Sequence, residues 1–463
     1  MMTTTVAARP IRSVNPASGE TIAEYSAHSP EAIDAALTRT RTAFEGWRTT
    51  TVDARAAKLH AMAAAIRAGS DRLAALITAE MGKPIAQAEA EIEKSAGVCE
   101  FYADHAADML APEPAELVGR EAFVQFLPLG PVLAIMPWNY PIWQVMRAAA
   151  PILSGGNTLV IKHAESVSGC ALALQKIFDD AGLGDGVVQT LLLDGPSASM
   201  VIADDRIAAA TLTGSERAGV AVGGAAGAAL KPCVLELGGS DAFIVVDDAD
   251  VHAAAQVAVN ARFQNTGQSC IAAKRFIVTD AVADEFIAAF TAATKALTIG
   301  DPFDRSTDVG PMSRVELRDE LDDQVTRAVA HGDTVLVGGT RSDGPGAFYP
   351  PTIVEVADTS SPIMQEETFG PVAAVIRVAD EDAAIRVAND SAYGLSSALW
   401  CGDRDRAVSI AARLDTGGCF INGMTASDPH IPFGGVKRSG FGRELGAYGL
   451  REFVNVQTVT IPD

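Results

Sequence analysis

Residues 208–219 read Ala-Ala-Ala-Thr-Leu-Thr-Gly-Ser-Glu-Arg-Ala-Gly, an apolar run that meets a polar, helix-forming segment at a glycine. The apolar part predicts a buried strand, and residues 215–229 predict the helix after it. The same alternation surrounds this stretch, with strands predicted at 121–126, 131–136, 158–162, 187–193 and 233–237 and helices at 142–150, 166–181 and 197–203. Because apolar strands alternating with helices form parallel sheets covered on both faces, this half of the chain predicts an α/β domain.

A second α/β block begins close to Gly238-Gly239-Ser240. Its predicted helices are 249–263, 282–297, 315–331, 381–389 and 404–414, and its predicted strands are 242–246, 275–279, 334–337, 373–378, 396–400 and 418–422. Residues 453–461 alternate apolar and polar side chains, which indicates an exposed strand suited to pair with another subunit. The long helical patterns before residue 110, including 53–81 and 84–109, show no group of polar residues and are interpreted as scaffold.

The composition narrows the class of protein. The chain has 463 residues, 48% of them hydrophobic, with a formal net charge of −22. These values predict a soluble protein of two or three domains and argue against nucleic acid or membrane as partners, since both require a positive face. Six cysteines without close pairing predict a cytoplasmic protein with no disulfide framework. Seven histidines without ligand-like spacing predict no metal site.

Three polar residues stand at predicted strand or helix ends. Residues 264–270 read Gln-Asn-Thr-Gly-Gln-Ser-Cys, a loop that can hold Cys270 as a rigid, exposed nucleophile. The alternative is that Cys270 is a small buried hydrophobe. Glu236 ends an apolar strand, where apolar surroundings raise the pKa of a carboxyl and suit it to general-base work. Asn139 closes another strand and offers an amide to an oxyanion, although it is equally compatible with a plain turn.

A dinucleotide site is suggested less directly, because no G-x-G-x-x-G segment follows a strand. Gly214 and Gly219 stand five apart at a predicted helix start and would let a pyrophosphate approach backbone amides. Lys162 and Glu165 follow another strand and suit the two hydroxyls of an adenosine ribose, where the carboxylate would repel a 2′-phosphate. An ordinary turn and a solvated ion pair are the alternatives at these two places.

Taken together, the segments resemble the NAD(P)-dependent aldehyde dehydrogenase superfamily. The matching motifs occur in the same order as in that family, and the resemblance extends from about residue 15 to residue 461. The matching blocks are Pro137-Trp-Asn, the strand end at Lys162, Thr213-Gly-Ser, Leu235-Glu-Leu-Gly-Gly, Asn265-Thr-Gly-Gln-Ser-Cys, Glu366-Glu-Thr-Phe-Gly-Pro and Pro432-Phe-Gly-Gly. The resemblance implies that Cys270 attacks an aldehyde and that Asn139 and the Cys270 N–H hold the oxyanion. It further implies that hydride passes to nicotinamide and that Glu236 activates the water that hydrolyses the thioester.

The resemblance also implies an architecture and a cofactor. It divides the chain into a Rossmann-type cofactor domain (1–120 and 128–238), an α/β catalytic domain (239–445) and a small β oligomerisation extension (121–127 and 446–463). A homodimer or homotetramer is expected from that extension. NAD is the expected cofactor, with NADP as the alternative. The implied cofactor-binding residues are Ile135, Pro137, Trp138, Lys162, Glu165, Gly195, Gly214, Ser215, Gly219, Leu237, Glu367 and Phe369.

The substrate is inferred from Arg147, which stands where members of the family that take simple aldehydes carry an aromatic residue. A guanidinium there favours an aldehyde with a carboxylate, as in the succinate-semialdehyde dehydrogenase branch. Ser427 matches a serine that binds the substrate carboxylate in that branch, and Tyr140 and Phe433 are further implied substrate contacts. Gln264 departs from members that place a second arginine there, which leaves a broad-specificity enzyme for short aliphatic or glutarate semialdehydes as the alternative. A surface role for Arg147, a non-catalytic protein with this fold and a phosphate-dependent acyl-phosphate reductase are less favoured interpretations.

Overall fold

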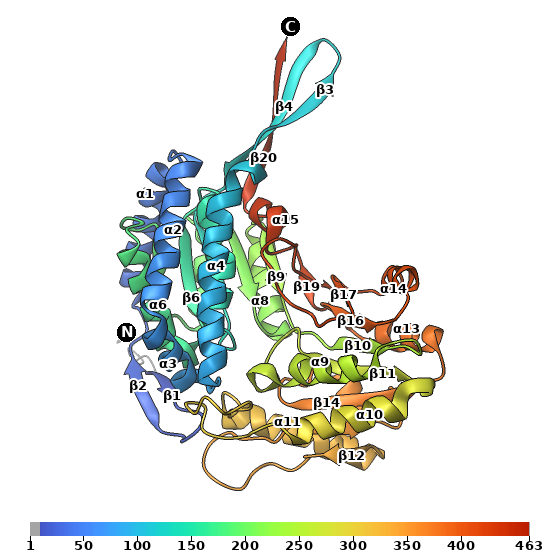
Figure 1. Ribbon diagram of the computed structural model, residues 1–463. Coiled ribbons are helices and arrows are strands. Elements are labelled where there is room, and N and C mark those ends of the chain that lie inside the picture. The colour runs from blue at the N-terminus through green and yellow to red at the C-terminus, as the bar shows by residue number, and fades with distance from the viewer. Residues whose placement is uncertain (1–9, 463) are drawn as a thin grey trace.

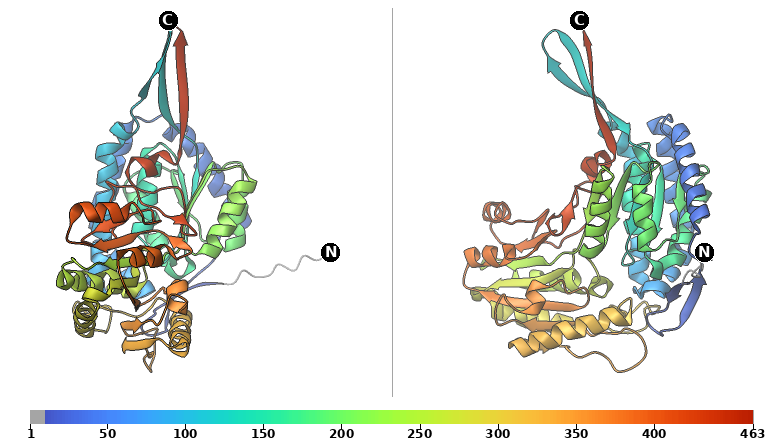
Figure 2. Two further views of the ribbon diagram at one scale, coloured as in Figure 1. Left: turned by 90° about the vertical axis from the view of Figure 1, so that its right-hand side faces the viewer. Right: turned by 180° about the vertical axis from the view of Figure 1, so that it is seen from behind.

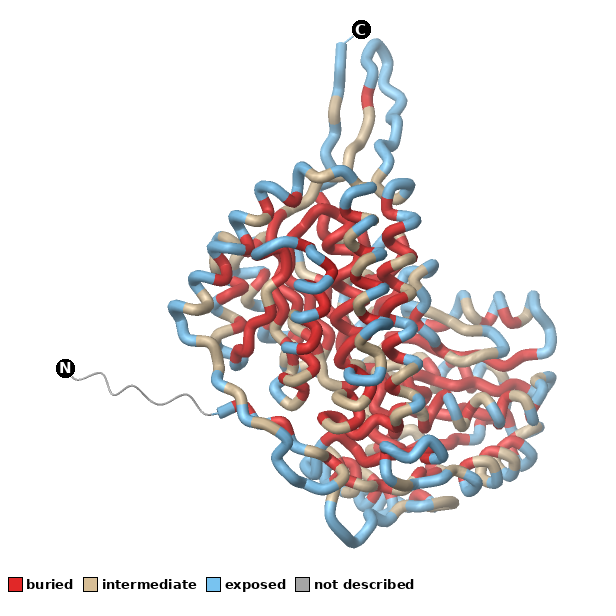
Figure 3. Tube along the Cα trace, turned by 60° about the vertical axis from the view of Figure 1, so that its left-hand side comes forward, coloured by how far each residue is buried: buried red, intermediate tan, exposed pale blue. Residues whose placement is uncertain are grey.

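The computed structural model describes residues 10–462 as two α/β bodies and a long β arm (Figure 1). Seen from several sides, the arm projects away from both bodies, and the C-terminal strand runs along it (Figure 2). Buried residues fill the interior of each body, whereas the arm is largely exposed (Figure 3). The predicted architecture of α/β domains built on parallel sheets is therefore confirmed.

The first body is built on a six-stranded sheet in the order β19-β9-β8-β5-β6-β7, parallel except for the β19–β9 pair. Its strands are β5 (Val132–Met136), β6 (Leu159–His163), β7 (Val188–Thr190), β8 (Ala209–Thr213), β9 (Cys233–Glu236) and β19 (Gly440–Phe441). Its helices are α1 (Pro30–Trp47), α2 (Val52–Ala68), α3 (Ser70–Met81), α4 (Ile85–Met109), α5 (Trp143–Ser154), α6 (Ser168–Asp180), α7 (Gly195–Ala203) and α8 (Glu216–Ala228), with the 3-10 turn η1 (Glu165–Val167). The chain order reverses on either side of β5, and ligands of such sheets bind at that switch point.

The second body is built on a seven-stranded sheet in the order β12-β13-β14-β11-β10-β16-β17, in which only β12–β13 is antiparallel. Its strands are β10 (Asp241–Val245), β11 (Ala273–Thr279), β12 (Thr334–Val337), β13 (Thr352–Glu355), β14 (Val372–Val378), β16 (Ser397–Trp400) and β17 (Cys419–Ile421). Its helices are α9 (Val251–Phe263), α10 (Asp280–Lys295), α11 (Val315–His331), α12 (Pro362–Gln365), α13 (Glu381–Asn389) and α14 (Arg404–Ala411), with the 3-10 turn η2 (Gln264–Gly267).

The arm is a three-stranded antiparallel sheet in the order β20-β4-β3. Its strands are β3 (Glu113–Leu117), β4 (Arg120–Pro128) and β20 (Val454–Pro462). The predicted extension lacked β3, because residues 113–117 contain a proline and two glutamates and do not resemble a strand in sequence. Residues 446–451, predicted as part of the extension, instead form helix α15 (Gly446–Arg451), which contacts α4 and α5 in the first body.

Two further differences from the predicted elements have local causes. The helix predicted over 53–81 is two helices, α2 and α3, which meet at Gly69. No strand was predicted at residues 440–441, which were placed in the catalytic domain, but they form strand β19 of the first sheet. Gly440 has φ +113° there, and a Cβ on it would lie 1.9 Å from the carbonyl oxygen of Leu235, so only glycine permits this pairing. The short pairs β1–β2 and β15–β18 complete the secondary structure: Ile11–Val14, Thr21–Tyr25, Tyr393–Gly394 and Val436–Lys437.

Neither a membrane-spanning helix nor a cluster of metal ligands is found within residues 10–462. No helix there combines the length and apolar character that crossing a bilayer requires. No group of three or more His, Cys, Asp or Glu residues is arranged to hold a metal ion in that part of the chain.

Candidate active site

The cysteine loop has a strained backbone that its neighbours hold in place. After α9 ends at Phe263, Asn265 and Thr266 adopt left-handed conformations with φ of 53° and 55°. Such conformations cost about 1–3 kcal/mol each and persist only where surrounding contacts fix them. The side-chain amide of Asn265 donates to the carbonyl of Asn139 at 2.9 Å, and the backbone N–H of Asn265 donates to Gln87 Oε1 at 2.7 Å. The Thr266 hydroxyl donates to the Gly310 carbonyl at 3.2 Å. The strained residues therefore lie five and four positions before the predicted nucleophile, in the same loop.

Cys270 lies between two cavities, and among residues 10–462 it is the only one that lines both. Burial raises the pKa of its thiol to about 12, while the charges of Arg147 and Lys274 act in the opposite direction. Lys274 is fully buried and donates to the carbonyls of Ser269 and Cys270 at 2.8 and 2.6 Å. It therefore fixes the loop and supplies positive charge beneath it. Burial therefore favours the thiol of Cys270 over the thiolate.

Asn139 and Glu236, the other two predicted catalytic residues, approach Cys270 from the first body. The Asn139 amide lines the same cavity as Cys270 and donates one N–H to the Gln268 carbonyl at 3.0 Å. Glu236 is buried at the end of β9, and neither carboxyl oxygen has a hydrogen-bond partner among the described residues. Burial and the charge of Glu444 raise its pKa, opposed by Arg147, so the neutral acid is favoured. Glu236 lines neither cavity.

The cofactor-side cavity has a volume of about 310 Å³ and lies where the carboxyl ends of β5, β8 and β9 face the second body. Seven of the predicted cofactor-binding residues line it: Pro137, Trp138, Gly214, Ser215, Leu237, Glu367 and Phe369. Ser215 caps α8 by accepting the N–H of Ala218 at 3.3 Å, so a helix N-terminus opens at this cavity. Such a terminus favours an anionic group.

Glu367 reaches into this cavity from the second body and is already engaged. It accepts the N–H of Gly239 at 3.0 Å and pairs with Lys274 at 3.5 Å. Its carboxylate thus joins the cofactor-side cavity to the lysine under the cysteine loop.

The remaining predicted cofactor residues lie along the same sheet edge but outside this cavity. Ile135 and Lys162 are register partners in β5 and β6, Glu165 begins η1, and Gly195 begins α7. Burial lowers the pKa of Lys162, and the charges of Glu165 and Asp194 oppose that shift. Asp194 is thus a second carboxylate near Lys162 that the sequence did not suggest.

Gly219 has a packing role. A Cβ on it would lie 2.6 Å from both Cδ atoms of Leu237, so the glycine lets α8 pack closely on the residue after β9. The sequence interpretation placed it at the pyrophosphate instead. Three residues at the start of α11 also line the cofactor-side cavity and were missed: Arg314, Leu317 and Glu320. They belong to an ordinary amphipathic helix pattern and carry no signal in a single sequence.

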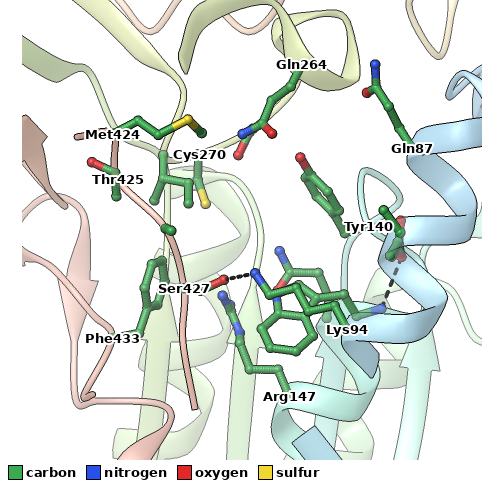
Figure 4. Close-up of a pocket in the computed structure, with 17 residues that line it drawn as sticks. Gln87, Lys94, Tyr140, Arg147, Gln264, Cys270, Met424, Thr425, Ser427 and Phe433 are labelled. Carbon is green, nitrogen blue, oxygen red and sulfur yellow. Dashed lines mark hydrogen bonds between the residues drawn. The ribbon is translucent and has the colours of Figure 1, made fainter. Parts of the chain in front are cut away.

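The second cavity has a volume of about 240 Å³ and contains all five predicted substrate-binding residues together with Cys270 (Figure 4). Those residues are Arg147, Tyr140, Gln264, Ser427 and Phe433. Arg147 is buried, and its guanidinium lies 4.7 Å from the centre of the Phe433 ring. It forms a buried ion pair with Glu444 and donates to the Thr213 hydroxyl at 3.3 Å. Arg147, which was predicted to bind the substrate carboxylate, therefore already has a carboxylate partner within the protein.

Helix α4, interpreted as scaffold from its sequence, contributes a polar stripe to this cavity. Gln87, Glu91 and Lys94 all line it. Their spacing of four and three residues places them on one helix face, and this spacing is the signal that could have identified them. Glu91 accepts the first N–H groups of α5, from Ile142 and Trp143, at 2.9 and 3.0 Å. It also pairs with the buried Lys83 and thus anchors the helix that carries Arg147.

These features define an enzyme site with a cysteine between a dinucleotide crevice and a small polar cavity. Residues 3–459 match the Aldehyde dehydrogenase family, and the chain belongs to that family. It is 49% identical over 458 residues to the succinate semialdehyde dehydrogenase [NAD(P)+] Sad of Escherichia coli (strain K12), covering 99% of each chain. It is 48% identical to succinate-semialdehyde dehydrogenase [NADP(+)] 1 of Mycobacterium ulcerans (strain Agy99), covering 98% of this chain and 100% of the relative.

A solved structure agrees with these relatives. The succinic semialdehyde dehydrogenase of Streptococcus pyogenes in complex with NADP+ superposes with a TM-score of 0.96 at 36% identity, covering 98% of this chain and 100% of that one. The sequence-based assignment to the aldehyde dehydrogenase family is therefore confirmed.

Proposed function

We propose that the protein oxidises succinate semialdehyde to succinate with NAD or NADP as the hydride acceptor. The observation that carries the proposal is the position of Cys270, which, alone among the residues that the structure describes, lines both the cofactor-side cavity and the cavity that contains Arg147. An aldehyde whose far end is a carboxylate fits this arrangement, because a buried guanidinium is a strong partner for a carboxylate. The E. coli and M. ulcerans relatives bear the name of this activity.

In the proposed reaction Cys270 Sγ bonds to the aldehyde carbon as the C=O π bond breaks, and the thiol proton passes to water. The Asn139 amide and the Cys270 N–H donate to the resulting oxyanion of the thiohemiacetal. NAD(P), when bound, would supply the hydride acceptor, and loss of hydride from that carbon would convert the thiohemiacetal into a thioester of Cys270. The carboxylate form of Glu236 takes a proton from water, the water oxygen bonds to the acyl carbon, and the C–S bond breaks. Cys270 leaves as the thiolate, and the acid product gives its proton to water to become the carboxylate.

The residues present fit the dinucleotide. The α8 N-terminus at Ser215 suits a phosphate, and Lys162 with Glu165 suits the ribose hydroxyls. The carboxylates of Glu165 and Asp194 near Lys162 favour NAD over NADP in this proposal, because they repel a 2′-phosphate. The names of the relatives include both coenzymes, so initial rates with NAD and NADP are the direct test.

The test of the substrate replaces Arg147 by phenylalanine in a Glu444→Gln background, so that no buried carboxylate loses its partner. We expect KM for succinate semialdehyde to rise by about 10- to 100-fold relative to Glu444→Gln alone, as a charged hydrogen bond is worth about 1.5–3 kcal/mol. KM for butanal, which lacks the carboxylate, should change little. An equal change for both aldehydes would refute carboxylate recognition by Arg147.

The alternative is a broad-specificity enzyme for short aliphatic aldehydes or glutarate semialdehyde. A side-by-side comparison of kcat/KM for succinate semialdehyde, glutarate semialdehyde and butanal separates the two functions. A value for butanal equal to that for succinate semialdehyde would favour the alternative.

We also propose a homodimer or homotetramer in the cytoplasm. The arm of β3, β4 and β20 supports self-association, because its strand edges are exposed and it packs on neither body over most of its length. All six cysteines are free, which is typical of a reducing compartment. Light scattering of the full chain and of a chain ending before residue 454 would test the assembly, and a monomer in both cases would refute it.

A further inference from the structure

Lys94 is a cation in the second cavity, the one that Arg147 and Cys270 line, and sequence reasoning did not identify it. It lies on α4, and its side chain is open to water from the cavity. Its ammonium donates to the Ser427 hydroxyl at 2.8 Å and lies 4.3 Å from the centre of the Trp143 ring. Figure 4 shows Lys94, Ser427 and Arg147 gathered at one side of the cavity, with Cys270 at another.

The neighbouring cations are neutralised, and Lys94 is not. Lys83 is paired with Glu91, and Arg147 is paired with Glu444. Within the described residues Lys94 forms no ion pair, and its polar contact is a neutral hydroxyl. An ammonium with three donors, one of them used by Ser427, retains donors for an incoming anion. The positive charge available to a ligand in this cavity therefore comes mainly from Lys94.

We propose that Lys94 is a specificity-determining residue that binds the carboxylate of the aldehyde substrate together with Arg147 and Ser427. The proposal rests on the proposed function. Some members of the family have a second arginine where this chain has Gln264, and Lys94 would supply the positive charge of that arginine. Lys94 and Ser427 come from different bodies, α4 and the loop after β17, so the carboxylate would be held where the two bodies meet. Neutral aldehydes of the same length would lack this contact.

The proposal predicts a pH dependence of substrate binding. The groups facing Lys94 are Arg147 on α5, Asp428 in the loop after β17, and Glu91 and Lys83 on or just before its own helix. Desolvation and Arg147 lower the pKa of Lys94 to about 8, opposed by Asp428 and Glu91. Because only the protonated ammonium attracts a carboxylate, KM for the carboxylated aldehyde should rise as pH increases above that value, and KM for butanal should not.

The experiment compares Lys94→Met, Lys94→Arg and the wild-type enzyme, all as the full chain. Lys176→Met is the control, because Lys176 is an exposed lysine of α6 paired with Asp180. KM is measured for succinate semialdehyde and butanal between about pH 7 and pH 9.5, and succinate and the uncharged butyramide are compared as inhibitors competing with the aldehyde. Thermal unfolding of each variant establishes that it is folded.

For Lys94→Met we expect an increase of about 10- to 100-fold in KM for succinate semialdehyde and in the inhibition constant of succinate, with butanal and butyramide changed less than about threefold. Lys94→Arg should retain much of the affinity and lose the alkaline rise in KM, because a guanidinium stays protonated. Equal changes for charged and neutral ligands, or an unchanged succinate constant, would overturn the role of Lys94. A wild-type enzyme with no preference for succinate semialdehyde over butanal would overturn the proposed function itself.

Discussion

Gly219 offers a test of how the fold shapes the coenzyme site. In Gly219→Ala the new methyl would lie 2.6 Å from both Cδ atoms of Leu237, whereas carbon atoms in contact lie about 3.5–4.0 Å apart. Leu237 must therefore shift by about 1 Å or change rotamer. Because Leu237 is buried and lines the cofactor-side cavity, its displacement should reduce the space for the coenzyme.

The magnitude follows from the cost of overpacking. An extra methyl in a packed site costs about 1–3 kcal/mol. If Leu237 relieves the clash by moving into the cavity, that cost appears in coenzyme binding, and Kd should rise by about 5- to 150-fold. Titration of the enzyme with NAD or NADP in the absence of aldehyde, followed by tryptophan fluorescence, measures Kd directly.

Gly224→Ala is the matched control on the same helix, since a Cβ there has no atom within 4 Å. It should leave Kd unchanged and stabilise the exposed helix by up to about 1 kcal/mol. An unchanged Kd in Gly219→Ala, or an equal loss in both variants, would refute the reasoning.

Three further predictions concern the buried charges. Because burial raises the pKa of Cys270 to about 12, its alkylation by iodoacetamide in the coenzyme-free enzyme should accelerate by about tenfold per pH unit between about pH 7 and 9.5, and a plateau below pH 9 would contradict this. Because the pKa of Glu236 is raised, the fraction of its basic form increases with pH, and the steady rate of turnover should increase with pH as well. Glu236→Gln should keep a burst of reduced coenzyme but lose about 100-fold or more of the steady rate of turnover. Loss of the burst would place the role of Glu236 before hydride transfer. Lys83→Met and Glu91→Gln should each cost about 3–5 kcal/mol of unfolding free energy in urea, and additive losses in the double variant would refute their coupling.

Much of the fold could be predicted because its signals are local. The strands at β5, β6, β8 and β9 are apolar runs, and each lies within one or two residues of its predicted bounds. The elements that were missed depend on contacts distant in sequence. Strand β3 is stable through its pairing with β4, and β19 exists because Gly440 can approach Leu235 closely. Neither pairing leaves a periodic pattern in the segment itself.

The site residues divide in the same way, into those that a local motif identifies and those that depend on contacts distant in sequence. Cys270, Asn139 and Trp138 belong to compact motifs and come together at the expected cavity. Lys94 and Arg314 lie on amphipathic helices, where a charged residue usually faces solvent. The spacing of Lys94 from Gln87 and Glu91 indicates a shared polar face of α4, but only the arrangement of the two bodies shows that this face and Arg314 line cavities.

The charges around Arg147 explain why a second cation is needed for a carboxylated substrate. Glu444 and Glu236 are both buried close enough to influence each other, and both pKa values are raised. One guanidinium cannot balance two buried carboxylates, so the arrangement favours Arg147 paired with ionised Glu444 and a protonated Glu236. A substrate carboxylate would add a negative charge to a pair that is already neutral. The ammonium of Lys94 balances that charge and allows the carboxylate to bind without breaking the ion pair between Arg147 and Glu444.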